Sequence, residues 1–336
     1  MRRKCYMALP LMIASAFCAI PVAAQNTEKV PAFSKLDVDV TGGTTGLGVE
    51  LSTPLNRSIS VRAGYSFMPH FTYDMDFYVS VGESTDPAVS NSRFQKMATA
   101  LKNITGYEVD NKVTMVGEPK MWNASLLVDF KPLHNKSWHI TTGFYWGSSR
   151  IGYAENSKGD MSSLFAIGMY NHLYEYAKAD EPLYTIDGTD VYLPTSVEDK
   201  MVEYGRMGVH VGTYKHDIVD ADGNVVHAKG TAYNMEPDNN CMVSAKMLVN
   251  AFKPYVGVGY DGRLGKAYGN WKIGFDAGVA FWGGTPRIIT HDGTDLVNDV
   301  TDLRQHVGHY VKLIKKVKAL PVINLKITKT LFKTKK

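Results

Sequence analysis

Three small groups of residues in this sequence combine types and spacings that could do chemistry. The first is Ser162, Ser163 and His172, which share one stretch of the chain and offer a hydroxyl nucleophile with a base. Catalysis would also need a third group that orients the base, and nothing in the spacing supplies one. We therefore predict that the chain is not an enzyme, with a protease or lipid acyltransferase as the least favoured function.

The other two groups could bind metal ions. His306 and His309 lie one helical turn apart and could share a zinc ion, but a third ligand is missing. Asp220, Asp222 and Asn224 surround a glycine as in the first half of a calcium loop, but the closing glutamate and the helical flanks are missing. An Asp-Gly turn explains this pattern better. We predict no metal site and no other cofactor.

A larger set of charged residues falls at alternate positions of segments that are typical of strands. Both signs occur in similar numbers: Asp37, Asp39, Glu50, Arg62, Asp129, Lys246, Lys272, Asp276 and Lys326. If the segments close into a barrel, these side chains line its interior. They could select solutes in a water-filled passage, or they could pair in a network that plugs a narrow barrel, since side chains just fill the interior at about eight strands. Unpaired buried charges are costly, and we favour the plug.

The element that would position these residues is a strand with one apolar face. Alternation is clearest in residues 271–282, where one face carries Trp271, Ile273, Phe275, Ala277, Val279 and Phe281. A strand of a soluble sandwich also alternates, but the length here matches the ~9–11 residues of a tilted membrane strand. The tryptophans at both ends fit the preference of such rings for the two membrane–water interfaces.

The same alternation recurs in residues 59–67, 124–130, 138–146 and 256–260, with Leu127 as an apolar exception on a polar face. Lipid offers no partner to the backbone groups of a sheet edge, so a spanning sheet must close on itself. The predicted fold is all-β: a closed, antiparallel, up-and-down transmembrane β-barrel, with a periplasmic sandwich as the competing fold. We predict ten strands, with eight or twelve as alternatives, near residues 35–42, 45–53, 57–68, 121–131, 138–149, 241–250, 254–262, 271–283, 286–292 and 320–332.

The connections between these strands are unequal in length. Short turns are predicted at 53–56, 131–136, 250–253 and 284–286, and long loops at about 69–120 and 150–239. Outer-membrane barrels have short periplasmic turns and long extracellular loops, so both chain ends are expected in the periplasm. Helices are predicted at 91–104, 160–177 and 294–318. The last is amphipathic, with aspartates near its start and lysines near its end, as the helix dipole favours. We favour packing of this helix on the barrel rim over a role as a lid or partner-binding helix.

The first 24 residues are typical of a secretory signal peptide, which leaves residues 25–336 as the barrel. A basic start at residues 2–4 precedes a short apolar run, and cleavage is expected after Ala24. Without the leader, 34 basic residues face 33 acidic ones, so the charge gives no argument for a nucleic-acid partner. Two of the three cysteines leave with the leader, so Cys241 remains alone and no internal disulfide is expected.

Several segments also resemble a known family. Residues 46–51, a Pro-Leu turn and residues 60–65, together with 252–260 and the ending 321–332, are similar to small Gram-negative outer-membrane barrel proteins of the OmpA/OmpW-like kind. The resemblance implies insertion by the barrel-assembly machinery, which in that family recognises an aromatic last residue. This chain departs by adding four residues after Phe332. The tethering domain of longer relatives is not implied.

These features predict a non-enzymatic protein of the cell outer membrane, either structural or a small-solute, porin-like pore. The alternative is a surface adhesin or receptor that binds an extracellular ligand through the long loops. The expected partners are outer-membrane lipid and the barrel-assembly machinery.

Overall fold

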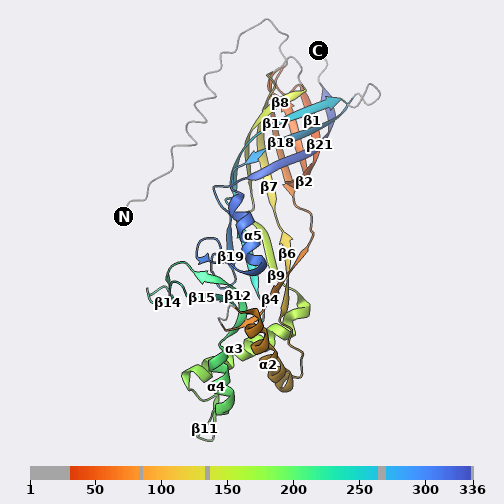
Figure 1. Cartoon of the computed structure of the whole chain (residues 1–336). Helices are drawn as coiled ribbons and strands as arrows, with labels where there is room; N and C mark the ends of the chain where they lie inside the picture. The colour runs from red at the N-terminus through yellow and green to blue at the C-terminus, as the bar shows by residue number, and fades with distance from the viewer. Residues whose placement is uncertain (1–30, 83–85, 133–136, 264–269, 334–336) are drawn as a thin grey trace.

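The computed structural model describes residues 31–82, 86–132, 137–263 and 270–333, with the backbone alone described at Pro87, Ile104, Thr105, Gln305 and His306. The predicted signal peptide, residues 1–24, lies outside the described residues. The chain forms two regions joined end to end (Figure 1). One is a barrel. The other is a mixed unit of helices and strands that we call the lobe, built from residues 68–121, 148–251 and 281–319.

The barrel is an antiparallel sheet of eight strands that closes on itself. Its order is β1-β2-β3-β7-β8-β17-β18-β21, and β21 pairs with β1 to complete the ring. The strands are β1 Lys35–Gly43, β2 Gly46–Pro54, β3 Ile59–Phe67, β7 Trp122–Phe130, β8 Trp138–Gly147, β17 Phe252–Arg263, β18 Trp271–Ala280 and β21 Leu320–Lys333. Each strand therefore has two neighbours, and the ring has no free edge.

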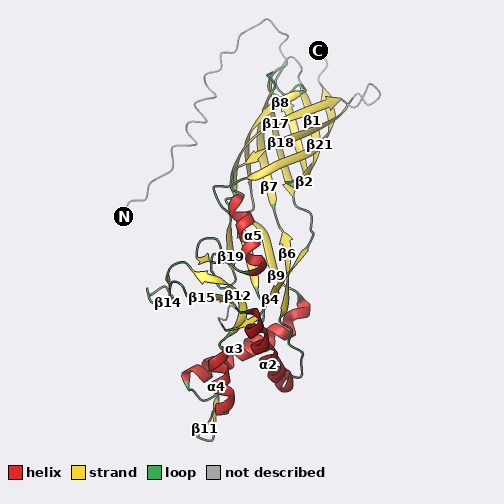
Figure 2. Cartoon of the chain, in the orientation of Figure 1, coloured by secondary structure: helices red, strands yellow, loops and turns green. Residues whose placement is uncertain are grey.

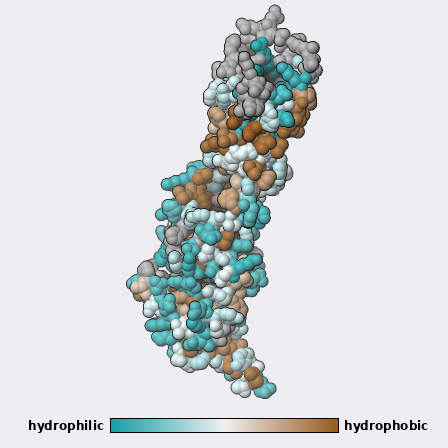
Figure 3. Space-filling view, turned by 90° about the vertical axis from the view of Figure 1, so that its right-hand side faces the viewer, coloured by the Kyte–Doolittle hydropathy of each residue, from teal (hydrophilic) through white to brown (hydrophobic). Residues whose placement is uncertain are grey.

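Successive side chains of each strand point to opposite faces, so the alternation in the sequence becomes an outside and an inside. Ile273 on β18 is 50% exposed and Leu325 on β21 is 67% exposed, whereas Asp276 on β18 is 5% exposed. In Figure 3 the hydrophobic colour gathers over the barrel, while the lobe is mostly hydrophilic. The barrel thus has an apolar outer surface and a polar interior, as the alternation predicts.

Exposed aromatic side chains gather at both ends of this apolar surface. Where the barrel meets the lobe, the ring centroids of Tyr65 and Trp122 lie 6.1 Å apart, and those of Trp122 and Trp146 lie 5.8 Å apart. At the opposite end, the rings of Trp138 and Tyr260 lie 5.1 Å apart. Two aromatic clusters therefore flank the apolar band.

The connections differ between the two ends of the barrel. The connection 55–58 between β2 and β3 lies at the end where β1 begins and β21 finishes, which we call the terminal end; β7 and β17 also end there, and β8 and β18 begin there (Figure 1). At the other end, which we call the lobe end, β1 and β2 are joined by a tight turn and the three lobe segments leave and return. The two long loops predicted at about 69–120 and 150–239 therefore lie at one end, but the tight β1–β2 turn lies there as well, so connection length alone does not separate the two ends.

The lobe is built from two main sheets and several helices (Figure 2). The larger sheet has five strands in the order β19 Arg287–Thr290, β16 Ser244–Leu248, β9 Arg150–Asn156, β6 Lys112–Pro119 and β4 Tyr73–Tyr78. The other contains β15 Ala232–Met235, β12 Met207–Tyr214 and β20 Val300–Thr301, with β5 Ser80–Val81 also paired to β12. The helices are α2 Pro87–Thr105, η2 Lys158–Asp160, α3 Met161–Ala179, α4 Thr195–Tyr204 and α5 Gln305–Lys316. Two hairpins complete the lobe: β10 Tyr184–Ile186 with β11 Thr189–Val191, and β13 Ile218–Val219 with β14 Val225–His227.

The lobe has an apolar core of its own. Phe94 from α2, Ile167 from α3 and Val211 from β12 are all buried in it, in the manner of a water-soluble protein. The helix predicted at 91–104 is confirmed as α2. The Asp86 carboxylate caps its start by accepting a hydrogen bond from the backbone N–H of Ala88, and a glycine at positive φ follows its end. The helix predicted at 160–177 corresponds to α3.

Two of the ten predicted barrel strands are wrong. The segments 241–250 and 286–292 contain β16 and β19, which pair with each other in the lobe, with Lys246 opposite Ile289. The barrel therefore has eight strands, and the predicted turns 250–253 and 284–286 lie on the lobe side. Length is the physical reason, because β16 has 5 residues and β19 has 4, too few to cross a bilayer.

The helix predicted at 294–318 begins later than expected, at Gln305. Asp295 is not in its first turn. Its carboxylate accepts hydrogen bonds from the backbone N–H of Val297 and the side chain of Asn298, and it forms an ion pair of 2.8 Å with Arg287. These contacts fold a turn in place of the first helical turns. Among the described residues, no helix has the length and apolar character needed to cross a bilayer.

Candidate functional site in the barrel interior

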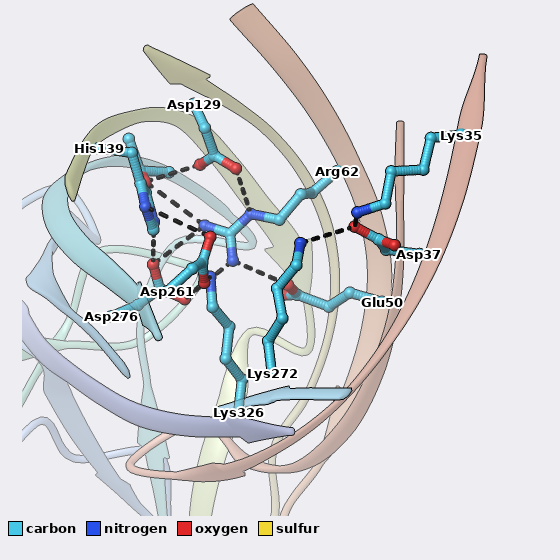
Figure 4. Close-up of polar contacts among 11 residues, drawn as sticks. Lys35, Asp37, Glu50, Arg62, Asp129, His139, Asp261, Lys272, Asp276 and Lys326 are labelled. Carbon is cyan, nitrogen blue, oxygen red and sulfur yellow. Dashed lines mark hydrogen bonds and ion pairs between the residues drawn. The ribbon is translucent and has the colours of Figure 1, made fainter. Parts of the chain in front are cut away.

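The candidate site is a network of charged side chains inside the barrel, contributed by seven of its strands (Figure 4). Each residue sits at a position of its strand that alternates with outward-facing apolar residues. Arg62, for example, lies between Val61 and Ala63 on β3 and is 2% exposed. The strand pattern alone therefore directs these charges into the lumen.

Arg62 is the centre of the network. Its guanidinium lies 3.1 Å from a carboxylate oxygen of Glu50, 3.0 Å from one of Asp129 and 2.8 Å from one of Asp276. A second guanidinium nitrogen donates to Asp276 at 3.2 Å, so this pair is bidentate. A planar, forked guanidinium suits such multiple contacts, whereas a lysine ammonium does not reproduce them. The Arg62 guanidinium thus connects its own strand, β3, to β2, β7 and β18.

Asp276 is a second branching point. It accepts a contact of 3.0 Å from Nε2 of His139 and lies 3.3 Å from Nζ of Lys326. Lys326 also contacts Asp261 at 2.9 Å. These bonds link the neighbouring strands β8, β17, β18 and β21, and each carboxylate named has a cationic or imidazole partner in the low-dielectric interior.

A smaller cluster lies at the terminal end of the lumen. Lys272 contacts Asp37 at 3.2 Å, Lys35 forms an ion pair with the same carboxylate, and the hydroxyl of Thr330 donates to it. A cavity of about 100 Å³ lies here and reaches inward to Arg62. This cavity is a shallow vestibule that ends at the network.

The lumen on the lobe side of the network is filled by apolar and aromatic side chains. Leu127, Tyr145, Tyr255 and Val322 form one buried cluster, in which the rings of the two tyrosines lie 5.4 Å apart. Leu127 is the residue that broke the alternation in the sequence, and its place in this cluster explains the exception. A polar layer and an apolar layer therefore close the barrel in series.

The network also requires a small residue beside it. A Cβ added to Gly259 would lie 2.3 Å from Nε2 of His139 and 2.4 Å from a carboxylate oxygen of Asp276. Any larger residue would displace these two side chains. Gly259 is therefore part of the site although it contributes no side chain.

Sequence reasoning placed most of this network correctly. Of the predicted interior residues, Asp37, Asp39, Glu50, Arg62, Asp129, Lys272, Asp276 and Lys326 lie inside the barrel. Lys246 is wrong: it lies exposed on β16 in the lobe, because that strand belongs to the lobe sheet. The prediction missed His139, Asp261 and the buried Lys253. The alternation at 138–146 already places His139 on the inward face, and extending the alternation at 256–260 by a few residues in both directions would have found Asp261 and Lys253.

The other candidate constellations do not assemble into sites within the described residues. Ser163 is buried on α3, where its hydroxyl accepts a hydrogen bond from the backbone N–H of Asp110, while Ser162 is exposed. His172 lies more than two turns further along the same helix, with its ring against Tyr176, so it does not reach either serine.

Asp220 instead closes the turn between β13 and β14. Its carboxylate accepts hydrogen bonds from the backbone N–H groups of Asp222 and Asn224, as expected for an Asp-Gly turn. The His306 side chain lies outside the described part, so the zinc hypothesis for His306 and His309 is not tested. No group of three or more metal-binding side chains occurs in the part of the chain that the structure describes.

Comparison with known proteins gives likenesses to solved structures alone. No family model matches the chain, and no curated protein does. The crystal structure of CarO from Acinetobacter baumannii is similar at 13% identity and a TM-score of 0.36, covering 88% of this chain and 96% of that one. The crystal structure of CarO2 from the same organism is similar at 15% identity and a TM-score of 0.35, covering 90% of this chain and 100% of that one. The crystal structure of a major outer membrane protein from Thermus thermophilus is similar at 11% identity and a TM-score of 0.30, covering 88% of this chain and 98% of that one. With TM-scores this low, function is argued from the chain itself.

Proposed function

We propose that this chain is a non-enzymatic outer-membrane β-barrel protein in which the barrel is a closed anchor for the lobe. The outer surface of the barrel supports the location, because exposed apolar side chains such as Ile273 and Leu325 are stable only in an apolar surrounding. The aromatic clusters at both ends fit two membrane interfaces. The strands have 9 to 14 residues, the length of tilted membrane strands. Membership of the OmpA/OmpW-like kind remains a prediction.

The long connections support an orientation with the lobe outside the cell. In outer-membrane barrels the short turns are periplasmic and the long connections extracellular. The terminal end, which carries both ends of the barrel, then faces the periplasm. This orientation agrees with export by the predicted signal peptide and with insertion by the barrel-assembly machinery, for which Phe332 lies exposed near the end of β21.

The pairing of Arg62 with three carboxylates is the observation that favours a structural anchor over a small-solute pore. A permeating ion would have to displace contacts that hold buried charges in place, and breaking a buried pair costs about 3–5 kcal/mol. The apolar layer around Leu127 adds a second obstacle. The interior charges then serve closure, which is the favoured of the two roles predicted for them, and not the selection of solutes.

Conductance in planar bilayers tests this function. We expect refolded full-length protein to insert without stable channels. The triple variant Arg62→Ser, Asp276→Ser, Leu127→Ala should conduct, because it removes the centre of the network, its bidentate partner and part of the apolar layer that also closes the barrel. Lys272→Ser, which touches only the vestibule, is the matched control and should stay silent. Stable channels in the unchanged protein, sensitive to Lys272→Ser, would contradict closure and favour the pore.

A second candidate function, surface adhesion or reception through the lobe, has one specific observation in its favour. The β10–β11 hairpin lies at the far tip of the lobe (Figure 1) and exposes Tyr184, Ile186 and the neighbouring Tyr192. Exposed aromatic and aliphatic side chains at a tip are typical of binding surfaces. Cells that display the triple alanine variant should bind fewer host or neighbouring cells than cells that display the unchanged protein. Equal binding would remove the support for this candidate.

A further inference from the structure

The lobe contains an apolar cavity that the closed barrel does not explain. It has a volume of about 410 Å³ and lies between α5 and one face of the five-stranded sheet. Val307, Val311 and Ile314 of α5 line one side, and Met75, Met115 and Met247 line the other. Small-molecule sites have volumes of about 300–1,000 Å³ and mostly apolar linings, so this cavity has the dimensions of a ligand site.

The cavity exists because the sheet beneath α5 is poor in side chains at this place. Gly117 on β6 pairs with Ala154 on β9, and Ala154 pairs with Ala245 on β16, so three small residues lie side by side. The apolar stripe of α5 cannot reach this floor. An unfilled apolar space forfeits dispersion contacts, and apolar cavities of this kind take up apolar guests.

The lining of the cavity extends toward the lobe end of the barrel. It includes Phe71, Pro119 and Ile314. Phe71 follows the end of β3 by four residues and Pro119 precedes β7 by three, so both lie within about 14 Å of the barrel strands. Figure 1 shows α5 directly against the lobe end of the barrel. Phe71 is itself exposed, so the cavity reaches the surface of the lobe near the segment that leaves β3.

Positive charge follows the lining residues in the sequence of α5, where Lys312 comes directly after Val311 and Lys315 directly after Ile314. Lys312, Lys315, Lys316 and Lys318 are all exposed and lie on the last turns of α5 and the segment that leads into β21. Leu313 and Val317 are exposed among them, an arrangement typical of a segment at a membrane interface. The one carboxylate that lines the cavity, that of Glu118, already contacts Nδ1 of His70 at 2.7 Å.

We propose that the cavity binds one acyl chain of a phosphorylated lipid from the outer leaflet, with the phosphate beside Lys315 and Lys318. The apolar lining matches the chain, the lysines match the phosphate, and the position next to the barrel gives the chain a path out of the bilayer. The proposal rests on the outer-membrane location proposed above. It assigns a ligand to the lobe, which the anchor function does not do.

Native mass spectrometry of delipidated full-length protein in mild detergent tests the proposal. The probes are phosphatidylglycerol and, as the phosphate-free probe, diacylglycerol with the same acyl chains. Gly152→Leu fills the cavity, because a Cβ at this position would meet only Met247, at 3.4 Å and 3.5 Å, among its near side chains. Gly168→Leu on α3 is the matched control, since its Cβ would meet only Pro237 at 3.9 Å, outside the cavity.

We expect stoichiometric phosphatidylglycerol on the unchanged protein and on Gly168→Leu. Gly152→Leu should weaken it by at least about tenfold, which corresponds to about 1.4 kcal/mol and lies within the penalty for overpacking. Lys315→Ser with Lys318→Ser should weaken phosphatidylglycerol but not diacylglycerol, whereas Lys158→Ser with Lys178→Ser should change neither. Binding that Gly152→Leu leaves intact would overturn the proposal by locating the lipid on the barrel surface.

Electrophoretic migration of unheated and heated samples keeps the two proposals separate. A folded barrel in the outer-membrane fraction that migrates differently after heating, yet binds no phosphatidylglycerol, would overturn the lipid site alone. A chain that shows neither property would overturn the outer-membrane function itself.

Discussion

The barrel and the lobe bury opposite types of side chain. In the barrel, the charged Arg62 is buried and the apolar Leu325 is exposed. In the lobe, the apolar Ile167 is fully buried, and Arg206 lies near the surface, where it pairs with Glu175 and Glu236. The difference teaches that residue type alone does not decide burial. The surrounding medium also decides it, because apolar side chains are stable in lipid and charged side chains are stable in water.

The largest expected effect comes from removing a central arginine in each region. Arg62→Met leaves three buried carboxylates without their cation and should destabilise the barrel by about 3–5 kcal/mol. Arg206→Met breaks partly exposed pairs and should cost the lobe about 0.2–1 kcal/mol. Urea titration of protein folded into lipid vesicles measures the first, and urea titration followed by protease resistance of the lobe measures the second.

If Arg62→Met does not assemble, Arg62→Lys provides the same test at a smaller loss, since it keeps the charge but not the forked geometry. Equal losses for Arg62→Met and Arg206→Met would contradict the contrast between a sealed interior and a hydrated surface.

The second comparison introduces an arginine at one exposed apolar position of the barrel and, in a separate variant, at one exposed apolar position of the lobe. Leu325 lies at the middle of the paired length of β21 and β18, where an arginine should cost about 2–4 kcal/mol if the surface faces lipid. Val226 of the lobe is comparably exposed, at 56%, and Val226→Arg should change stability by no more than about 0.5 kcal/mol in water. The fraction of folded protein on unheated gels from outer-membrane samples reports the result. A barrel indifferent to Leu325→Arg would place its outer surface in water.

The sequence could predict the outer surface of the barrel but not the number of its strands. Alternation is a local property, and it occurs wherever one face of a strand is apolar. In β18 that face lies on the outer surface of the barrel, whereas in β16 the alternate residues Ala245 and Met247 line the cavity beneath α5. The pattern alone does not distinguish these cases. The strand lengths of the structure do, since the 5 residues of β16 cannot cross a bilayer, but the segment predicted at 241–250 is long enough to cross, so predicted length could not have corrected the position of Lys246.

The candidate site shows a similar division. Alternate residues of a strand face the same side, so the alternation indicates which charges face inward. Arg62 and Asp276 could both be assigned to the lumen in this way. Their pairing could not be predicted, because 214 residues separate them and the order of strands around the ring brings them together. The lobe was the least predictable region. Its three segments come from separate connections, and the core that joins them depends on contacts that no single segment encodes.

Acid should act on the lobe through Asp292. Burial acts to raise the pKa of its carboxyl, but hydrogen bonds from Thr290, Thr294 and Tyr233 outweigh burial and hold the pKa below its usual range. A carboxyl with a lowered folded-state pKa stabilises the fold above its unfolded pKa, near 3.9, and loses this contribution as the pH falls through the folded value. The unchanged lobe should therefore exceed Asp292→Asn in stability by about 1 kcal/mol at neutral pH, after allowance for solvent screening.

Protease resistance of the lobe in urea, measured from neutral pH downward, checks this prediction. The two proteins should converge below about pH 4, while the migration of the barrel on unheated gels should be the same for both at every pH. A difference that persists at low pH would show that the carboxylate is not the source of the stability.

The smallest effect is expected at the edge of the lobe, in the turn between β13 and β14. Asp220→Ala removes the acceptor for the backbone N–H groups of Asp222 and Asn224, but the turn is exposed. The global stability of the lobe should change by less than about 0.5 kcal/mol. Hydrogen exchange of the amides of Asp222 and Asn224 should nevertheless speed up, because each loses its acceptor. Adding calcium to the unchanged protein separates the two explanations of this sequence. A turn held by Asp220 alone exchanges at the same rate with or without the ion, whereas a slower rate with calcium would mean that these side chains bind it.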